Sequence, residues 1–469
     1  MAHRKKPKTR PAKIETDPMP DPNTGPEAAK PPAGKRKPSL LNTFLLHFRP
    51  RTVPERTLKF TLSWGLGGMA AVSVMIQILT GILLKFVYEP FPDRAYQSIV
   101  ILQRDVIFGQ FIRNLHHWTG NILVAVSFLH MLRVLFTGAW DRPRRLNWII
   151  GCALFFLILI SNFTGYLLPW DQLAYWAITI CTGMLEYIPG IGAWLQTMIR
   201  GGHEVGAASL RIFFSIHTAV VPGCLFLLSG FHFWRTRKAG GLILPHAPDG
   251  TIGEKPFRVP AIPNLLLREG VVALVLLAVI FTVSAFINAP LEAPANPGLS
   301  PNPTKAPWYF AGFQELLLHF HPLFAVFIIP VLGVGLVVFL PYYNSPSEGA
   351  GVWFGSHKGR RMAVSAAVTG VIATSAGMIV SEFLFEKTAS ASLLPAIMGN
   401  GLFLFFGACV VIAGYGFFMK KTHSATDTET IQTLFVFTLA AFVVLTVTGI
   451  GFRGYDMKLM WPWMVGQGV

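Results

Sequence analysis

The chain has 469 residues, of which 52% are hydrophobic and only 13% are charged. Apolar runs of about 18 residues or more recur along it, long enough for a helix to cross a bilayer, and they exclude a soluble globular protein. Much of the formal net charge of +16 lies ahead of the first apolar run and in short connections. The positive-inside rule places basic residues there, so the charge does not indicate nucleic-acid binding.

The amino-terminal residues 1–40 are rich in Lys, Arg and Pro and contain almost no large apolar side chains. This composition is typical of a disordered tail, which we expect on the cytoplasmic side. Residues 41–48 are expected to form a short surface helix that ends before Pro50. The membrane part of the chain is therefore expected to follow this region.

Nine apolar segments follow, and each is expected to form a transmembrane helix. They are residues 60–87, 114–137, 146–168, 212–235, 268–289, 323–341, 363–385, 400–418 and 431–451. Basic residues cluster before the first segment and in every second connection after it, which places these clusters on one side of the membrane. We therefore expect an all-α, multi-pass protein of the cell (inner) membrane with a cytoplasmic N-terminus and an outer C-terminus.

Two of these segments carry paired histidines. His116 and His130 are 14 residues apart, and His217 and His232 are 15 apart. These spacings fall about 40° short of four helical turns and about 60° beyond them, so each pair lies near one helical face at levels about 21 Å apart. Facing helices of this kind predict two stacked haems, although a single histidine is more often a hydrogen-bonded core residue. Since no Cys-X-X-Cys-His motif occurs, we expect non-covalent haems.

Glycines repeat the spacing of the first histidine pair. Gly67 and Gly81 in the first segment are 14 residues apart, and so are Gly151 and Gly165 in the third. A residue without a Cβ lets a flat macrocycle approach the backbone. Glycine also serves close packing of membrane helices, which is the alternative interpretation of either pair alone.

Arg113 and Arg133 each stand three residues beyond one of the histidines. Their position suits the propionates of a haem. Arginines at a membrane interface that extend toward water explain the same position equally well.

The outer connection 169–211 is too apolar for an exposed loop, so we expect short helices at the membrane surface. The outer connection 302–322 lies on the same side of the membrane and is aromatic. Aromatic side chains there, among them Trp308 and Tyr309, together with Glu315 are expected to line a pocket for an aromatic ligand. An interfacial belt of aromatic residues is the alternative.

Five motifs occur in this order: LGG…QILTG (66–81), RNLH…LHMLR (113–133), GYLLPWDQ (165–172), RIFFSIHT…GFHFWRTRKAGG (211–241) and APWYF (306–310). From about Val53 to Pro341 the chain resembles cytochrome b of the quinol:cytochrome c (or plastocyanin) reductases, the Rieske/cytochrome b complexes. The 15-residue histidine spacing and the RKAGG sequence resemble the plastid and cyanobacterial branch, in which the equivalent region is divided between two chains.

The resemblance implies an N-terminal four-helix bundle that holds two b haems, followed here by about five further helices. His116 with His217 would ligate the outer haem, and His130 with His232 the inner one. The resemblance also implies that Gly67, Gly81, Gly151 and Gly165 face the haems and that Arg113 and Arg133 bind propionates.

Quinol oxidation is implied at the outer aromatic site, where Trp308 and Tyr309 stand. One electron would pass to a partner Rieske protein, and the other would cross the haems to an inner quinone site. Arg237 is a candidate to line that site, and a basic residue placed there only by the positive-inside rule is the alternative. Family members with the plastid-type pattern attach a further haem through a Cys at the position of Gly65, so no covalent haem is expected at that position.

The four positions of the family's Pro-Glu-Trp-Tyr motif read Ala306-Pro307-Trp308-Tyr309, so its glutamate is missing. Glu315 is our candidate for the proton acceptor, because a helix would place it on nearly the same face as Trp308. A helix-end or partner-contact carboxylate is the alternative. His319 and His321 are weaker candidates for the same task.

These features predict four regions: the tail 1–40, a di-haem domain 41–240, a domain 241–345 with the outer quinol loop, and additional helices with an outer tail 346–469. The predicted function is the cytochrome b subunit of a quinol-oxidising Rieske/cytochrome b complex, acting as an enzyme within it. Expected partners are a Rieske iron–sulfur protein, a c-type cytochrome, quinone, membrane lipid and a second copy of the complex. The alternatives are a di-haem anchor that links a soluble dehydrogenase to the quinone pool and a proton-relay transporter.

Overall fold

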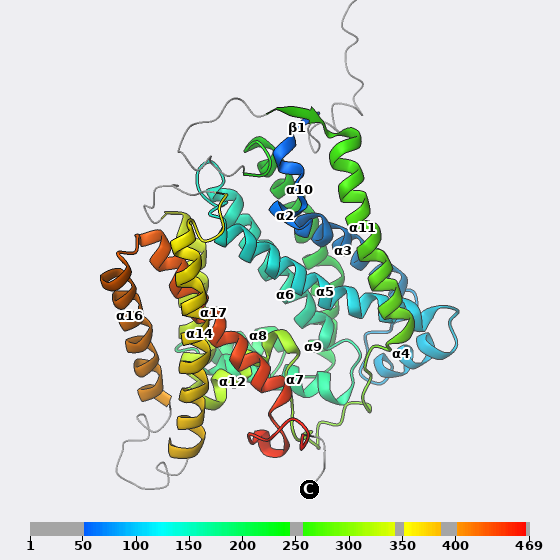
Figure 1. The fold of residues 1–469 in the computed structure, drawn as a ribbon. Coiled ribbons are helices and arrows are strands. Elements are labelled where there is room, and N and C mark those ends of the chain that lie inside the picture. Colours follow the sequence, from blue (N-terminus) through cyan, green and yellow to red (C-terminus); the bar gives the residue numbers. More distant parts are fainter. Residues whose placement is uncertain (1–50, 244–256, 343–350, 386–400, 466–469) are drawn as a thin grey trace, which may run out of the picture. The chain divides into compact units, whose positions relative to one another are not determined.

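The computed structural model describes residues 51–243, 257–342, 351–385 and 401–465, which all belong to one unit of the chain, Leu46–Val469. Within these residues the fold is helical apart from one two-stranded sheet (Figure 1), and nine helices are long and apolar enough to cross a membrane. The predicted all-α membrane fold is therefore confirmed. The predicted tail 1–40 and surface helix 41–48 lie outside the described residues.

Each predicted segment corresponds to one long helix. The spans are α3 (Leu66–Leu84), α5 (Gly109–Phe136), α6 (Arg145–Tyr166), α9 through α10 (Ala207–Lys238), α11 (Ala261–Phe286), η4 through η5 with α13 (Leu323–Tyr342), α14 into η6 (His357–Phe383), α16 (Phe403–His423) and α17 (Asp427–Gly451). Their ends differ from the predicted ends by up to seven residues, as at Ala261 where the prediction was 268. Apolar content fixes a span, whereas local capping fixes its end.

The first span begins later than its apolar run suggests. A short helix α2 (Phe60–Ser63) stops at Trp64, and both Trp64 and Gly65 have left-handed backbone conformations, with φ of 55° and 65°. This conformation is costly for residues other than glycine and breaks a helix. The continuous helix α3 therefore starts only at Leu66.

Side-chain caps mark the starts of other helices. Thr426 accepts a hydrogen bond from the Glu429 N–H, and Glu429 accepts one from the Thr426 N–H, which forms a capping box at α17. Ser356 accepts from the Gly359 N–H at the start of α14. These caps satisfy amide groups that the first helical turn leaves without partners.

The first four spans pack around a shared apolar cluster. It consists of buried side chains from α5, α6 and α10 (Val221–Lys238): Leu123, Val124, Ile158, Val221 and Leu225. Helix α3 packs against α5, and α11 covers both of them. This arrangement brings the histidines of α5 opposite those of the fourth span.

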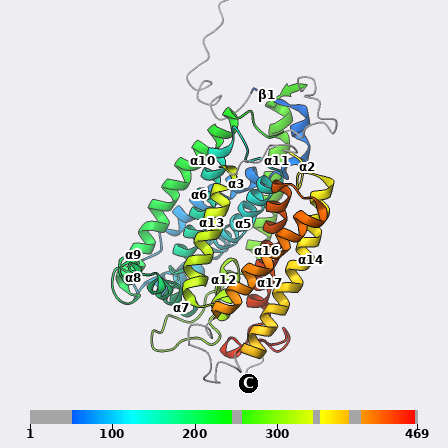
Figure 2. The ribbon, with the colours of Figure 1, turned by 90° about the vertical axis from the view of Figure 1, so that its left-hand side faces the viewer.

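The C-terminal spans form a second group. Helix α14 packs along α17 at Gly370, where a Cβ would lie 2.7 Å from the Phe437 carbonyl oxygen, so these backbones approach too closely for any other residue. Helix α12 (Trp308–His319) also packs on α17. Figure 2 shows α14, α16 and α17 together on the right of the view.

Shorter elements connect the spans. Strand β1 (Thr52–Pro54) pairs antiparallel with β2 (Arg258–Pro260), which joins the entry to the first span to the entry to α11. The remaining short elements are η1 (Glu55–Leu58), α4 (Ala95–Arg104), α7 (Gln172–Gly183), η2 (Met184–Tyr187), α8 (Gly192–Arg200), η8 (Tyr455–Met457) and α12. Helices α7 and α8 confirm that the connection 169–211 contains short helices, and α12 shows that the stretch with Trp308 and Glu315 is also helical.

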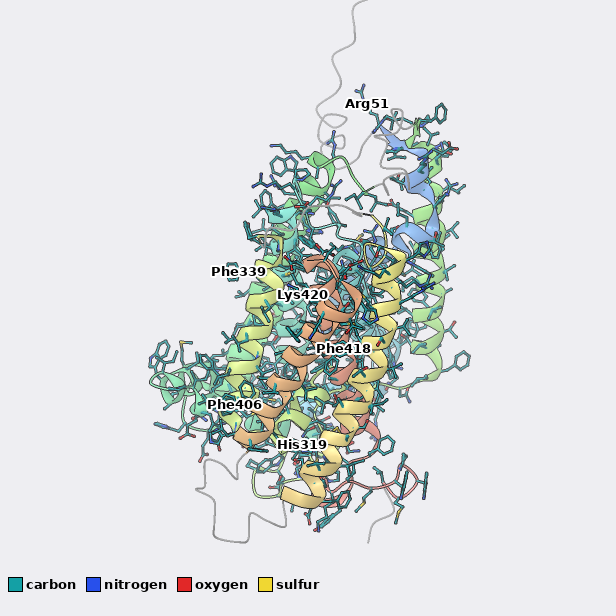
Figure 3. All side chains as sticks on the ribbon, turned by 60° about the vertical axis from the view of Figure 1, so that its left-hand side comes forward. Arg51, His319, Phe339, Phe406, Phe418 and Lys420 are labelled. Atoms are coloured by element: carbon teal, nitrogen blue, oxygen red, sulfur yellow. The ribbon has the colours of Figure 1, made fainter. Side chains whose placement is uncertain are left out.

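The labelled residues define the two ends of the helices. Arg51 lies at the β1 end and His319 of α12 lies toward the opposite end, with Lys420 between them (Figure 3). Helices α7, α8 and α12 also lie toward the end opposite β1 (Figure 1). For brevity, the end that holds α7, α8 and α12 is called the α12 end.

Candidate functional site

His116 and His217 face each other between α5 and the fourth span. Their ring centres are 6.1 Å apart, with an interplanar angle of 79°. Two imidazoles that bind one metal through bonds of about 2.0 Å hold their ring centres about 6 Å apart. The two rings therefore stand at the separation that a shared metal requires.

Hydrogen bonds at Nδ1 fix the tautomer of both rings. His217 Nδ1 lies 2.9 Å from the Ser161 carbonyl oxygen, which only accepts, so Nδ1 carries the proton. His116 Nδ1 lies 2.8 Å from Thr80 Oγ1, and that hydroxyl donates its own proton to the Ile76 carbonyl. Each ring is thus left with a lone pair on Nε2, which is the form that ligates a metal.

A local change in helix type accommodates the 15-residue spacing. His217 lies in η3 (Ile216–Val220), a π-helical turn between α9 (Ala207–Ser215) and α10, and Pro222 follows in the first turn of α10. A π-turn holds one more residue than an α-turn. The additional residue is absorbed there, so His217 and His232 lie on one face although their spacing exceeds four α-helical turns.

Each of the four histidines contacts a glycine on a neighbouring helix. A Cβ built on Gly165 would lie 2.5 Å from His217 Cε1, and one on Gly81 would lie 3.4 Å from His116 Cε1. The corresponding distances are 3.3 Å from Gly67 to His130 and 3.5 Å from Gly151 to His232. A Cβ at Gly165 would clash with its imidazole and one at Gly67 would be tight, whereas a Cβ at Gly81 or Gly151 would make ordinary van der Waals contact.

The second pair, His130 and His232, lies nearer the β1 end of the same two spans. His130 and His232 are close enough to interact electrostatically. Arg133 is buried beside this level, and its Nε donates to the Leu62 carbonyl at 2.8 Å. Its Nη2 is buried without a hydrogen-bond partner among the described residues. An unpartnered guanidinium nitrogen is costly in hydrocarbon unless an anion such as a carboxylate binds it.

Arg113 has a different environment. Its Nη1 donates to the Ala289 carbonyl at 2.8 Å and its Nη2 to the Pro290 carbonyl at 2.6 Å. Asn114 adds bonds to Ser284 and Ala289. The helix that carries His116 therefore also holds the segment that follows α11.

The PWDQ motif, residues 169–172, also binds the connection that follows α11. Asp171 accepts from the Glu292 N–H at 3.1 Å, and the Gln172 N–H donates to the Ala293 carbonyl at 2.8 Å. Asp171 also caps α7 through the Ala174 N–H. The two outer connections are thus joined by backbone and side-chain hydrogen bonds, which sequence spacing did not reveal.

The aromatic start of α12 lies against the paired-histidine bundle. Trp308 Nε1 donates to Asn121 Oδ1 on α5 at 2.7 Å. Tyr309 packs on the cluster around Leu123, and burial raises the pKa of its hydroxyl, which stays protonated. Phe310 packs edge-on against Phe163 of α6.

Glu315 lies on α12 as predicted, but its partners differ from those of Trp308. It is fully buried, and Arg453 donates to both its oxygens, from Nε at 2.8 Å and Nη2 at 2.9 Å. Burial alone would raise the pKa of the Glu315 carboxyl. Hydrogen bonds from His319 and Arg453 and the Arg453 charge instead hold this pKa below its ordinary value.

Arg453 is the centre of a buried ionic cluster that the sequence did not predict. Its Nη1 donates to both oxygens of Glu382 at 3.0 Å, and His319 Nε2 lies 3.5 Å from Glu315. Ser381 lies 2.9 Å from His319 Nδ1. His321 is not part of the cluster: its Nδ1 accepts from the Leu323 N–H at 3.2 Å.

Two further predicted positions lie toward the β1 end. Arg237 is half-buried in the last turn of α10. A Cβ on Gly65 would lie 2.8 Å from Val272 Cγ1, and its φ of 65° is also unfavourable for a side chain. Backbone geometry and the neighbouring helix both favour glycine where plastid-type relatives are expected to carry a Cys.

Comparisons with known proteins agree with this arrangement. The sequence model of the family Cytochrome b/b6/petB matches residues 54–240. Cytochrome b6 of Heliomicrobium gestii is 41% identical over 188 residues, which are 40% of this chain and 87% of that protein. Cytochrome b6 of Prochlorococcus marinus (strain AS9601) is 41% identical over 175 residues, 37% of this chain and 80% of that protein.

A solved structure shows the same fold over a longer part of the chain. It is described as a hyperthermophilic respiratory Complex III and matches with a TM-score of 0.63 at 24% identity, covering 86% of this chain and 98% of that one. At this identity the likeness concerns the fold alone, whereas the family rests on the sequence matches. The chain belongs to the cytochrome b/b6 family and is the cytochrome b subunit of a quinol-oxidising electron-transport complex.

Proposed function

We propose that this chain is the catalytic, quinol-oxidising subunit of a quinol:cytochrome c oxidoreductase and holds two non-covalent b haems. His116 with His217 ligates the haem at the α12 end, and His130 with His232 ligates the other. The facing pair His116 and His217 carries the proposal. Its ring separation, its two fixed tautomers and its adjacent glycines agree with axial ligation.

The chain's own residues prepare both cofactor positions. Gly67, Gly81, Gly151 and Gly165 leave room beside the imidazoles for a flat ring. Arg133 offers its unpartnered nitrogen to a propionate, and Arg113 offers the donors that the two carbonyls leave free. When bound, bis-imidazole haems supply one-electron carriage and leave no open position on iron for oxygen.

Quinol binds at the α12 end in this proposal, against Trp308 and Tyr309. Asn121 holds the Trp308 indole through its Nε1–H, and Asn121 lies on the helix of His116, so the aromatic wall has a fixed relation to the nearest imidazole. Tyr309 is buried and protonated, and it can donate a hydrogen bond to a quinol oxygen. This arrangement positions substrate close to the first electron acceptor.

Glu315 remains the proposed proton acceptor, with His319 beside it. It is the one carboxylate on α12, and its ionised form is favoured by Arg453. To accept a proton it must loosen one of the two bonds from Arg453. The formal charges of Arg453, Glu315 and Glu382 sum to one excess negative charge, which a single added proton neutralises.

The arrangement in the membrane follows from the basic residues. We place the β1 end in the cytoplasm and the α12 end outside, in the cell (inner) membrane. Arg237 then lies near the inner quinone. A Rieske iron–sulfur protein and a c-type cytochrome bind at the outer end, and lipid and a second copy of the complex complete the surroundings. The four regions 1–40, 41–240, 241–345 and 346–469 are retained as functional divisions.

An optical redox titration of the purified complex tests this function. Two b-type midpoints are expected in the wild type, and His217→Ala is expected to remove one of them. His203→Ala changes an exposed loop histidine and serves as control. Retention of both midpoints in His217→Ala would contradict the assignment. The di-haem anchor is not favoured, because the relatives are cytochromes b6.

A further inference from the structure

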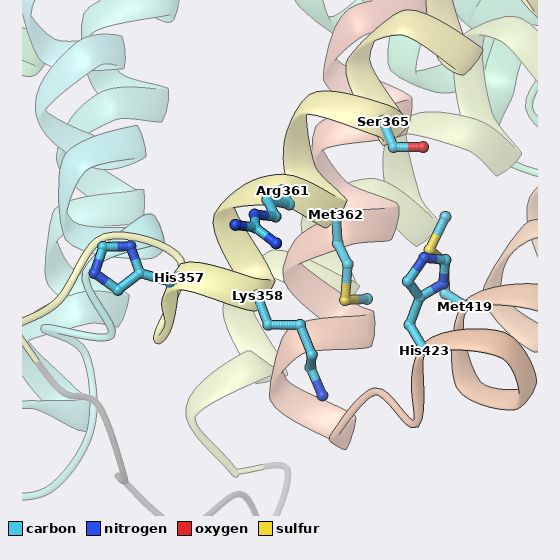
Figure 4. Close-up of a pocket in the computed structure, with 7 residues that line it drawn as sticks. All are labelled: His357, Lys358, Arg361, Met362, Ser365, Met419 and His423. Atoms are coloured by element: carbon cyan, nitrogen blue, oxygen red, sulfur yellow. The ribbon is translucent and has the colours of Figure 1, made fainter.

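A basic cavity lies between α14 and α16 (Figure 4), where α14 begins and α16 ends. These helix ends point toward β1 (Figure 1). Its volume is about 400 Å³. The floor is formed by Met362 of α14 and Met419 of α16, which are almost fully buried. Lys358, Arg361 and His423 also line the cavity, which therefore combines an apolar floor with the positive charges of Lys358 and Arg361.

The two walls of this cavity meet over a small area. Tyr415 of α16 donates to Ser365 of α14 at 3.2 Å, but α16 otherwise packs mainly against α17. Both helices expose apolar side chains beyond the cavity, among them Val364, Val368 and Phe418. An apolar surface therefore continues from the floor toward the middle of the membrane segment.

The rim holds a cation that the protein leaves uncompensated. Lys358 is paired with Glu429 at 3.0 Å and also donates to the Ser424 carbonyl. Arg361 has no ion pair and no hydrogen bond from its guanidinium among the described residues. Figure 4 shows Met362 between Lys358 and His423, with Arg361 directly beside Met362 on the same turn of α14. Arg361 is exposed, so its guanidinium is accessible to an exogenous anion.

Phosphate is the anion that best fits this rim. A guanidinium presents parallel N–H donors that match two phosphate oxygens. Basic pockets between transmembrane helices at the cytoplasmic surface bind anionic lipid headgroups. The apolar floor and the exposed helix faces below it match acyl chains, which free phosphate does not have.

We propose that this cavity binds the phosphate group of an anionic phospholipid, with Arg361 as its principal ligand. The lipid's acyl chains lie along the apolar surfaces of α14 and α16. In this way one lipid molecule fills the gap between two helices that make few direct contacts.

The test measures lipid binding to the purified full-length chain in its complex. Native mass spectrometry compares dioctanoyl phosphatidylglycerol with dioctanoyl phosphatidylcholine. Arg361→Gln is expected to weaken phosphatidylglycerol binding about tenfold, because it removes one charge-assisted contact. Arg360→Gln removes the neighbouring exposed charge, which does not line the cavity, and is expected to leave binding within about twofold. Arg361→Lys is expected to retain part of the affinity.

Three results would overturn the proposal. One is equal loss of phosphatidylglycerol binding in Arg361→Gln and Arg360→Gln, which would indicate diffuse surface attraction. Another is equal binding of phosphatidylcholine. The third is full displacement of phosphatidylglycerol by inorganic phosphate at the same concentration, which would indicate a free-anion site. Because Arg361 lies far from both histidine pairs, an unchanged b-type absorbance verifies that each variant is folded.

Discussion

Replacing Arg453 with Met tests the buried ionic cluster directly. Arg453 is 1% exposed and makes bidentate contacts to both Glu315, at 2.8 and 2.9 Å, and Glu382, at 3.0 Å. Methionine keeps much of the volume but removes the charge, which leaves a fully buried carboxylate without a counter-charge. Removing one partner of a buried pair costs about 3–5 kcal/mol. The variant is expected to lose stability by that amount at neutral pH.

The loss depends on pH with a defined sign. In the wild type the pKa of Glu315 is below its ordinary value, so this group contributes stability at pH above 4.5 that is lost as the pH falls through the lowered pKa. Without Arg453, burial dominates and raises that pKa, so the ionised form destabilises the fold as pH rises. The stability difference between variant and wild type is therefore expected to shrink as the pH is lowered toward 4.5.

Unfolding in mixed micelles, followed by tryptophan fluorescence at pH 7 and pH 5, measures this difference. Adding Glu315→Gln to Arg453→Met removes the stranded charge and is expected to recover part of the stability. The reasoning is refuted by a loss below about 0.5 kcal/mol, which is typical of exposed residues. It is also refuted by a pH-independent loss that the second substitution leaves unchanged.

Three further substitutions test the site. Gly165→Ala places a Cβ 2.5 Å from His217 Cε1 and is expected to remove most of one b-type signal in the optical titration. Gly223→Ala is the control: its Cβ would have no heavy atom within 4 Å, and both b-type signals are expected to remain. Trp308→Phe removes the hydrogen bond to Asn121 and is expected to slow quinol oxidation by about tenfold with both haems retained; equal turnover would exclude a positioning role. Glu315→Gln is expected to slow quinol oxidation without haem loss and to flatten its pH profile, and unchanged turnover would remove Glu315 as proton acceptor.

The sequence predicted the parts of the fold that depend on periodic patterns. The spans follow from continuous apolar runs, and the facing of His116 and His217 agrees with their helical spacing. The left-handed pair at Trp64 and Gly65 shortened the first span, because a single backbone conformation interrupts a helix without changing its hydropathy. The π-turn at His217 likewise leaves the apolar pattern unchanged.

Contacts between distant segments could not be predicted. Arg453 and Glu315 are separated by 138 residues, and the pairing of β1 with β2 joins segments about 200 residues apart. Nothing in a local pattern identifies the partner of a buried charge. Glu315 and Trp308 share a helix as predicted, but they stand two turns apart and meet different neighbours, α17's tail and α5.

Because Arg113 donates hydrogen bonds to the Ala289 and Pro290 carbonyls, α5 supports both the candidate haem site and the connection that leads to α12. Arg113 lies three residues before His116 on α5, and it binds the connection between α11 and α12. A displacement of α5 would therefore move both the His116 imidazole and the aromatic side chains at the start of α12. The position of α5 consequently determines both the placement of the metal-binding imidazole and the shape of the proposed quinol site. A substitution that disturbs one of these sites is expected to affect the other.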